Sequence, residues 1–200
     1  MLNCDPVAFT KSRTALASQP LESHSIEDLT MNRTRIAAAV WIVLVGVYCA
    51  LLMSHSSELP SRMATHFDGA GRPNGWQTRD QFLLWACLGP VLIGLFVAGI
   101  CYTCRWFPTR LNIPNKEYWT SPERFPLAFD FLMAWAMWFA VLMLLSMGGL
   151  MFGVIQANES STPSLDVARA PLALAITVPT IGMAGMVSWM ITFYGKQRSA

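Results

Sequence analysis

The sequence predicts an all-α membrane protein: four transmembrane helices with a small folded extracytoplasmic loop between the first and the second. Composition is the first observation behind this prediction, because 54% of the 200 residues are hydrophobic and 13% are charged, whereas soluble chains carry about 25% charged residues. The second observation is that the apolar residues form four runs of the length needed to cross a hydrocarbon core about 30 Å thick. These runs cover residues 36–53, 82–104, 127–152 and 171–194.

The basic residues between the runs predict how the helices are oriented. Ten of the 14 lysines and arginines precede the first run, follow the fourth, or lie between the second and the third. The others are Arg62, Arg72, Arg79 and Arg169. Because basic loops stay in the cytoplasm, we expect both termini and the central loop there, and residues 54–81 and 154–170 outside.

The sequence divides into a polar extension and two helix hairpins. Residues 1–30 are polar and lack apolar periodicity, which is typical of a disordered cytoplasmic extension. We expect the natural start at Met31, just before the basic flank of the first run. The units that follow are a two-helix unit over residues 31–104 with its outer loop over 54–81, a cytoplasmic loop over 105–126, and a second hairpin over 127–200 with a short cytoplasmic tail.

The sequence also disfavours several classes of function. A net charge of +2 offers no basic surface to a nucleic-acid partner. Asp130, in the first turn of the third run, is the only carboxylate within a run, whereas coupled transporters place charged groups at mid-membrane. No histidine lies within a run, and Cys101-x-x-Cys104 has no second Cys/His pair, so we expect neither haem nor zinc, nor another cofactor.

The outer loop is the stretch richest in specific turn residues. Pro60 fixes its first turn, Asp68-Gly69 is a tight-turn pair, and Pro73-Asn74-Gly75 is another. A loop of this length with so much turn chemistry is expected to be folded. We expect short extended pieces, such as residues 63–68, joined at the glycines.

His66 and Asp68 are the titratable pair of this loop. Two residues apart on a strand, they would share one face, which allows a metal or acid–base site with His55 and Glu58 as further ligands. The alternative is a histidine hydrogen-bonded to a turn aspartate that holds the loop in place. Two ligands fall short of a metal site, so we expect the structural role, no metal and no catalytic residue.

The central loop contains a second segment that is expected to be ordered. Ser121-Pro122-Glu123 predicts a helix start, with the serine as N-cap and the proline in the first turn. Tyr118 and Trp119 would anchor the loop among the headgroups. The segment would form either a short interfacial helix, which we favour, or a docking site for a cytoplasmic partner. Its candidate residues are Pro114, Asn115, Tyr118, Trp119, Pro122 and Glu123.

The order Leu59-Pro60, His66-Phe67-Asp68, Gly71 and Asn74-Gly75-Trp76, directly after a first span, resembles the bacterial domain of unknown function 1648. That domain also forms the N-terminal part of the Sdp immunity protein. The resemblance covers roughly residues 36–100, and residues 113–124 are similar to a loop of many four-helix members. It implies a multi-pass protein of the bacterial cytoplasmic (inner) membrane. It places functional weight on Pro60, His66, Phe67, Asp68, Gly71, Asn74, Gly75 and Trp76.

These observations favour a non-enzymatic binding, sensing or immunity-like protein whose outer loop recognises a peptide or an envelope partner. An accessory subunit of a membrane complex or transporter is the alternative, with Gly149-x-x-x-Gly153 and the region of Gly182 as helix-docking faces. A metal-dependent membrane enzyme using His66 and Asp68 is less favoured. The lipid bilayer is the expected partner in every case, and both a membrane protein partner and a homo-oligomer are compatible with these features.

Overall fold

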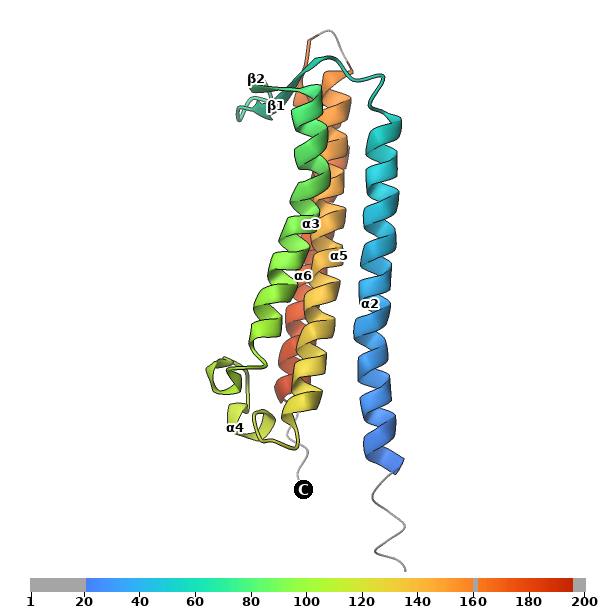
Figure 1. Ribbon diagram of the computed structural model, residues 1–200. Coiled ribbons are helices and arrows are strands. Elements are labelled where there is room, and N and C mark those ends of the chain that lie inside the picture. The colour runs from blue at the N-terminus through green and yellow to red at the C-terminus, as the bar shows by residue number, and fades with distance from the viewer. Residues whose placement is uncertain (1–20, 160–161, 196–200) are drawn as a thin grey trace, which may run out of the picture.

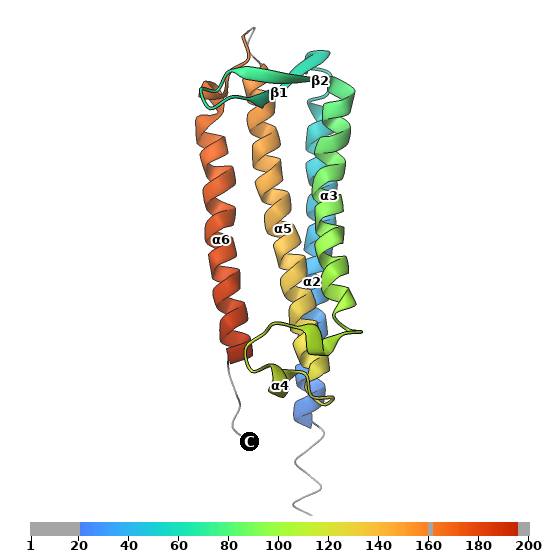
Figure 2. The same cartoon turned by 90° about the vertical axis from the view of Figure 1, so that its left-hand side faces the viewer.

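Helix α5, Phe125–Asn158, is the central element of the computed structural model, which describes residues 21–159 and 162–195. The other long helices are α2, Leu21–Ser54, α3, Arg79–Thr103, and α6, Arg169–Gly195. Each of them packs along α5, whereas α2 and α3 touch one another over a short stretch. Figure 2 shows α6 on one side of α5, with α2 and α3 on the other.

The predicted membrane architecture is confirmed. Within the described residues, four helices are long and apolar enough to cross a membrane: Arg33–Ser54, Arg79–Thr103, Phe125–Asn158 and Leu172–Gly195. The start of α2 and the end of α6 lie at the same end of the bundle (Figure 1). We call this the loop end and the opposite one the hairpin end.

The hairpin end carries the small folded loop that the sequence predicts. Strands β1, Arg62–Phe67, and β2, Pro73–Thr78, pair antiparallel and lie across the ends of α3 and α5 (Figures 1 and 2). Thr78 then caps α3, because its hydroxyl accepts from the Gln81 N–H at 3.3 Å and its own N–H donates to Gln81 Oε1 at 3.2 Å. This capping box joins the second strand directly to the second span.

Helix α5 extends further than the sequence predicts. It ends at Asn158 rather than near residue 152, so residues 154–158, expected in an outer loop, are helical. The physical reason is burial: Val154 and Ile155 pack with Met63 of β1 in one apolar cluster at the hairpin end. A helix that gains such contacts is stabilised beyond the hydrophobic run that the bilayer requires.

Two further boundaries differ from the predicted ones. The backbone of α2 runs back to Leu21, into the segment assigned to the extension, whose residues 1–20 lie outside the described residues. The predicted helix start at Ser121-Pro122-Glu123 is a turn, and α5 begins at Phe125 with its own proline in the first turn. Pro126 rather than Pro122 therefore occupies the position that tolerates a missing N–H.

Glycines let α5 and α6 approach closely. A Cβ added at Gly149 would lie 2.6 Å from Ala175 Cβ, and one added at Gly153 would lie 2.8 Å from a methyl carbon of Leu172. A Cβ at Gly182 of α6 would meet Leu142 of α5 at 3.0 Å. The glycines expected to dock a partner helix therefore lie inside the contact between the protein's own helices.

This close packing makes Gly149→Ala destabilising. The added methyl meets both Cβ and Cα of Ala175, so the helices must separate, and overpacking of this kind costs about 1–3 kcal/mol. The thermal unfolding midpoint in detergent should fall. Gly185→Ala is the matched control, because nothing lies within 4 Å of its added Cβ. Equal midpoints for the two variants would contradict this packing.

Candidate functional site

The hairpin is fastened to α5 by one buried amide side chain. Asn158 Oδ1 accepts from the Ala64 N–H, and Asn158 Nδ2 donates to the Ala64 carbonyl, both at 2.8 Å. Nδ2 also donates to the Val154 carbonyl of its own helix at 2.8 Å. Ala64 is fully buried and Asn158 is 6% exposed. The amide thus satisfies a peptide group that water cannot reach.

The register of the hairpin explains why Ala64 needs a partner outside the sheet. The Arg79 N–H donates to the Ser61 carbonyl at 3.0 Å, which makes Ser61 and Arg79 a hydrogen-bonded pair. Along an antiparallel ladder, hydrogen-bonded pairs alternate with pairs that exchange no hydrogen bonds. Ala64 and Trp76 form a pair of the second kind, so the N–H and C=O of Ala64 face away from β2. Asn158 therefore occupies the outer edge of β1 as a third strand would. The sequence signal for it, one asparagine beyond an apolar run, is weak.

The turn of the hairpin is held by Asp68. Its Oδ1 accepts from the N–H groups of Ala70 and Arg72, each at 2.9 Å, and its own N–H donates to the Arg72 carbonyl at 2.8 Å. Gly71 closes the turn at φ +77°, a conformation that favours glycine. Strand β1 ends at Phe67, so Asp68 lies in the turn rather than on the strand face of His66.

The side chain of His66 packs against the opposite strand. A Cβ added at Gly75 would lie 2.8 Å from His66 Cβ and 3.1 Å from its ring, so only glycine fits there without displacement. The other two ligands considered for a metal site, His55 and Glu58, contact one another, with His55 Nδ1 3.5 Å from Glu58 Oε2. Nowhere in residues 33–159 and 162–195 do three or more His, Cys, Asp or Glu side chains gather as a metal site would require.

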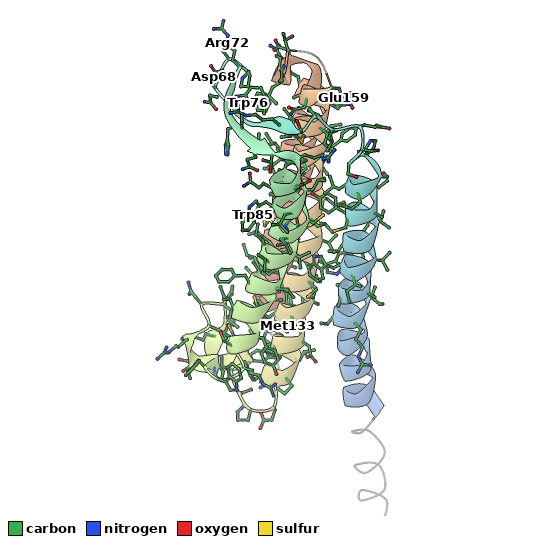
Figure 3. The ribbon with its side chains drawn as sticks, turned by 45° about the horizontal axis from the view of Figure 1, so that its top comes forward. Asp68, Arg72, Trp76, Trp85, Met133 and Glu159 are labelled. Carbon is green, nitrogen blue, oxygen red and sulfur yellow. The ribbon has the colours of Figure 1, made fainter. Side chains whose placement is uncertain are left out.

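The outward surface of the hairpin combines an aromatic with charges. Trp76 is 42% exposed, and the Arg62 guanidinium lies 5.7 Å from its ring centroid, within cation–π distance. Figure 3 shows Asp68, Arg72 and Trp76 on the hairpin, beyond the end of α3. Pro60 and Asn74 are also exposed, and Phe67 is half-buried. We call Arg62, Arg72 and Trp76 the hairpin surface.

A polar hollow adjoins the hairpin surface. The Leu165 N–H, in the short helix η2, Leu165–Ala168, donates to the Gly71 carbonyl at 3.2 Å and ties the turn to the start of α6. The hollow between them has a volume of about 380 Å³. Asp166 and Arg169 form an ion pair of 2.6 Å on its wall. Two loops distant in sequence thus form one continuous surface at the hairpin end.

The second predicted segment, at the loop end, is bound to α6. Trp119 Nε1 donates to the Tyr194 carbonyl at 2.7 Å, and Asn115 Nδ2 donates to the carbonyls of Tyr194 and Gly195 at 3.1 Å. These bonds satisfy carbonyls that the end of a helix leaves free. Helix α4, Lys116–Trp119, is a single short turn that precedes the predicted helix start at Ser121.

The predicted headgroup anchor is wrong for Trp119. Its side chain is 6% exposed and stacks on Phe193 at a centroid distance of 5.0 Å, because the end of α6 covers it. Tyr118 is partly exposed, under the Arg124 guanidinium at 4.2 Å. The remaining candidates, Pro114, Pro122 and Glu123, are exposed.

These features define a multi-pass membrane protein with a hairpin cap between its first two spans. The segment from α2 through the hairpin to α3 also matches a family model: residues 37–97 match the model described as "Domain of unknown function (DUF1648)". The chain thus carries a DUF1648 domain, as its motif residues imply. No curated protein and no solved structure matches the chain.

Asn158→Leu should loosen the hairpin. Leucine has a similar size but cannot bond the buried N–H and C=O of Ala64, and each unpaired group costs about 1–3 kcal/mol. We expect a lower unfolding midpoint and faster hydrogen exchange at Ala64 than in wild type. Asn112→Leu, the same change at an exposed loop position, should leave both quantities unchanged. An Ala64 amide as protected as in wild type would refute the role of Asn158.

Substitutions at Asp68 separate a turn role from a charge role. Asp68→Asn keeps an acceptor for the Ala70 and Arg72 amides, whereas Asp68→Ala removes it. Loss of such a side-chain cap costs about 1 kcal/mol, so Asp68→Ala should speed exchange of these amides about fivefold. Asp68→Asn should leave them close to wild type. If the asparagine variant exchanged as fast as the alanine variant, the negative charge would be the feature that matters.

Proposed function

We propose that this protein is a non-enzymatic binding or sensing protein whose hairpin end lies outside the cytoplasm and recognises a peptide or an envelope partner. The observation that carries this proposal is Trp76, 42% exposed on a hairpin that is anchored from beneath. Exposed tryptophan and arginine side chains are frequent centres of binding energy in protein interfaces. An immunity-like role, in which the partner is a toxic peptide, belongs to the same class.

Rigidity of the hairpin supports a recognition role. Asn158 holds the edge of β1, Asp68 fixes the turn, and Gly71 accepts a hydrogen bond from the second loop. A surface that is already ordered loses less conformational entropy when a partner binds. The hairpin surface and the adjoining polar hollow together offer aromatic, charged and backbone contacts.

The role of accessory subunit remains the alternative. A partner helix would need a surface other than Gly149, Gly153 and Gly182, because those positions pack α5 against α6. Exposed apolar side chains of α3 and α6, such as Phe96 and Ile181, would then be the contact positions. The use of His66 and Asp68 as a metal-dependent site finds no support in their separate contacts.

Accessible cysteines test the proposed orientation. In a background without the natural cysteines, Ser57→Cys at the hairpin end should react with a membrane-impermeant maleimide on intact cells. Thr120→Cys at the loop end should react only after permeabilisation, because basic residues gather at that end. Labelling of Thr120→Cys on intact cells would place the hairpin in the cytoplasm and end the proposal of an external partner.

Photocrosslinking tests recognition itself. p-Benzoylphenylalanine at position 76 should give a discrete protein or peptide adduct in native membranes, and Arg62→Ala should weaken that adduct because it removes the cation next to the ring. Position 106 is the matched control, since Trp106 is also exposed but follows α3 at the loop end. An adduct with lipid alone at position 76 would mean that Trp76 is only an interfacial anchor.

A further inference from the structure

A long apolar groove runs between α2 and α5 in the half of the bundle next to the hairpin. Its volume is about 440 Å³. Leu44, Val47 and Leu51 form the α2 wall, and Leu145, Gly148 and Phe152 contribute the α5 wall. Val47, Leu51, Leu145 and Phe152 are 47–59% exposed, so the groove opens sideways toward the bilayer. It is separate from the hairpin surface.

The length of the groove matches one leaflet of a membrane. It extends along α2 from Leu44 to His55. Eleven residues of helix rise about 16 Å, and half of a hydrocarbon core measures about 15 Å. His55 lies just beyond the last residue of α2, so the upper end of the groove reaches the level of the headgroups.

The volume fits a hydrocarbon chain and not a helix. A cavity of about 150 Å³ holds one benzene molecule, so a groove roughly three times larger holds a chain of about 15–18 carbons. An α-helix is about 10–12 Å wide with its side chains, and 16 Å of it occupies more than about 1,000 Å³. A transmembrane segment of a partner or of a second copy could therefore lie over the groove but would not fit within it.

Polar groups are confined to the mouth of the groove. The hydroxyl of Tyr48 donates to the Ala86 carbonyl at 3.0 Å, which leaves a hydrocarbon-like interior. At the mouth, His55 Nδ1 lies 3.5 Å from Glu58 Oε2, so Nε2 is the ring nitrogen that is left to bond a headgroup oxygen. An apolar interior with a hydrogen-bonding mouth is the pattern that a single lipid requires.

We propose that this groove binds one acyl chain of a phospholipid from the leaflet at the hairpin end, with its headgroup at His55. The bound chain fills the space between α2 and α5. The site is independent of the hairpin surface, since recognition of a partner by Trp76 does not require it.

The test uses the full chain in phosphatidylcholine vesicles that contain a trace of phosphatidylcholine with a diazirine in one acyl chain. Adducts after illumination are mapped by mass spectrometry. We expect the groove segments, residues 44–55 and 144–155, to be labelled about tenfold more than the lipid-facing surface around Leu92 and Phe96, as about 1.4 kcal/mol of preference would give. Equal labelling of groove and outer surface would overturn the proposal.

Filling the groove provides the decisive comparison. Gly148→Phe places a ring on the floor of the groove, where an added Cβ makes only an ordinary contact of 3.4 Å with Tyr48. It should abolish the preferential labelling, and native mass spectrometry should show loss of the single retained lipid that we expect with wild type. Gly89→Phe is the matched control, since it adds the same ring on α3 where nothing lies within 4 Å of the new Cβ.

Two further variants keep the outcome interpretable. Leu51→Phe narrows the groove from α2 at a side chain that is 59% exposed, so it should reduce labelling even if Gly148→Phe fails to fold. His55→Ala should reduce lipid retention about tenfold, since it removes the hydrogen bond to the charged headgroup. Unchanged labelling in a folded Leu51→Phe variant, or unchanged retention in His55→Ala, would contradict the assigned chain position or headgroup position.

Discussion

A buried peptide group of the hairpin, that of Ala64, constrains the whole hairpin end of the molecule. Its N–H and C=O lie out of reach of water and face away from β2, and both bond the side chain of Asn158. Together with the burial of Val154 and Ile155, the cost of leaving these groups unpaired keeps α5 helical up to Asn158 and holds the hairpin close to the bundle. Met63 packs in the apolar cluster at this end, and Gly71 in the turn accepts a hydrogen bond from Leu165 in the loop before α6.

The spans and the hairpin turns could be predicted from the sequence, because they depend on residues that are close together along the chain. Hydrophobic length defined the spans, because a hydrocarbon core imposes it, and the Asp68-Gly69 and Pro73-Asn74-Gly75 pairs marked a folded hairpin. Features that depend on distant partners were not predictable. Asn158 acquires its role from a strand register 94 residues away, and Trp119 is buried only because the end of α6 covers it. A single chain carries no signal for such pairings.

The two ends of the molecule use side chains for the same purpose. At the hairpin end Asn158 completes a strand edge, and at the loop end Asn115 and Trp119 complete the last turn of α6. In both arrangements a side chain satisfies backbone groups of a different segment near the ends of the spans, where unpaired groups are costly. Between the two ends, α5 contacts every other long helix and so connects the hairpin end to the loop end.

The distance along the chain between Ala64 and Asn158 also sets an order of assembly. At a synthesis rate of about 5–20 residues per second, the 94 residues between them take roughly 5–20 s to appear. For the part of that interval that follows the synthesis of α3, the first helix pair is complete while one edge of its hairpin is still unpaired. The segment matched by the family model, residues 37–97, likewise ends before Asn158. In this protein the edge of β1 thus receives its last hydrogen bonds from α5, a helix that is made after the matched segment.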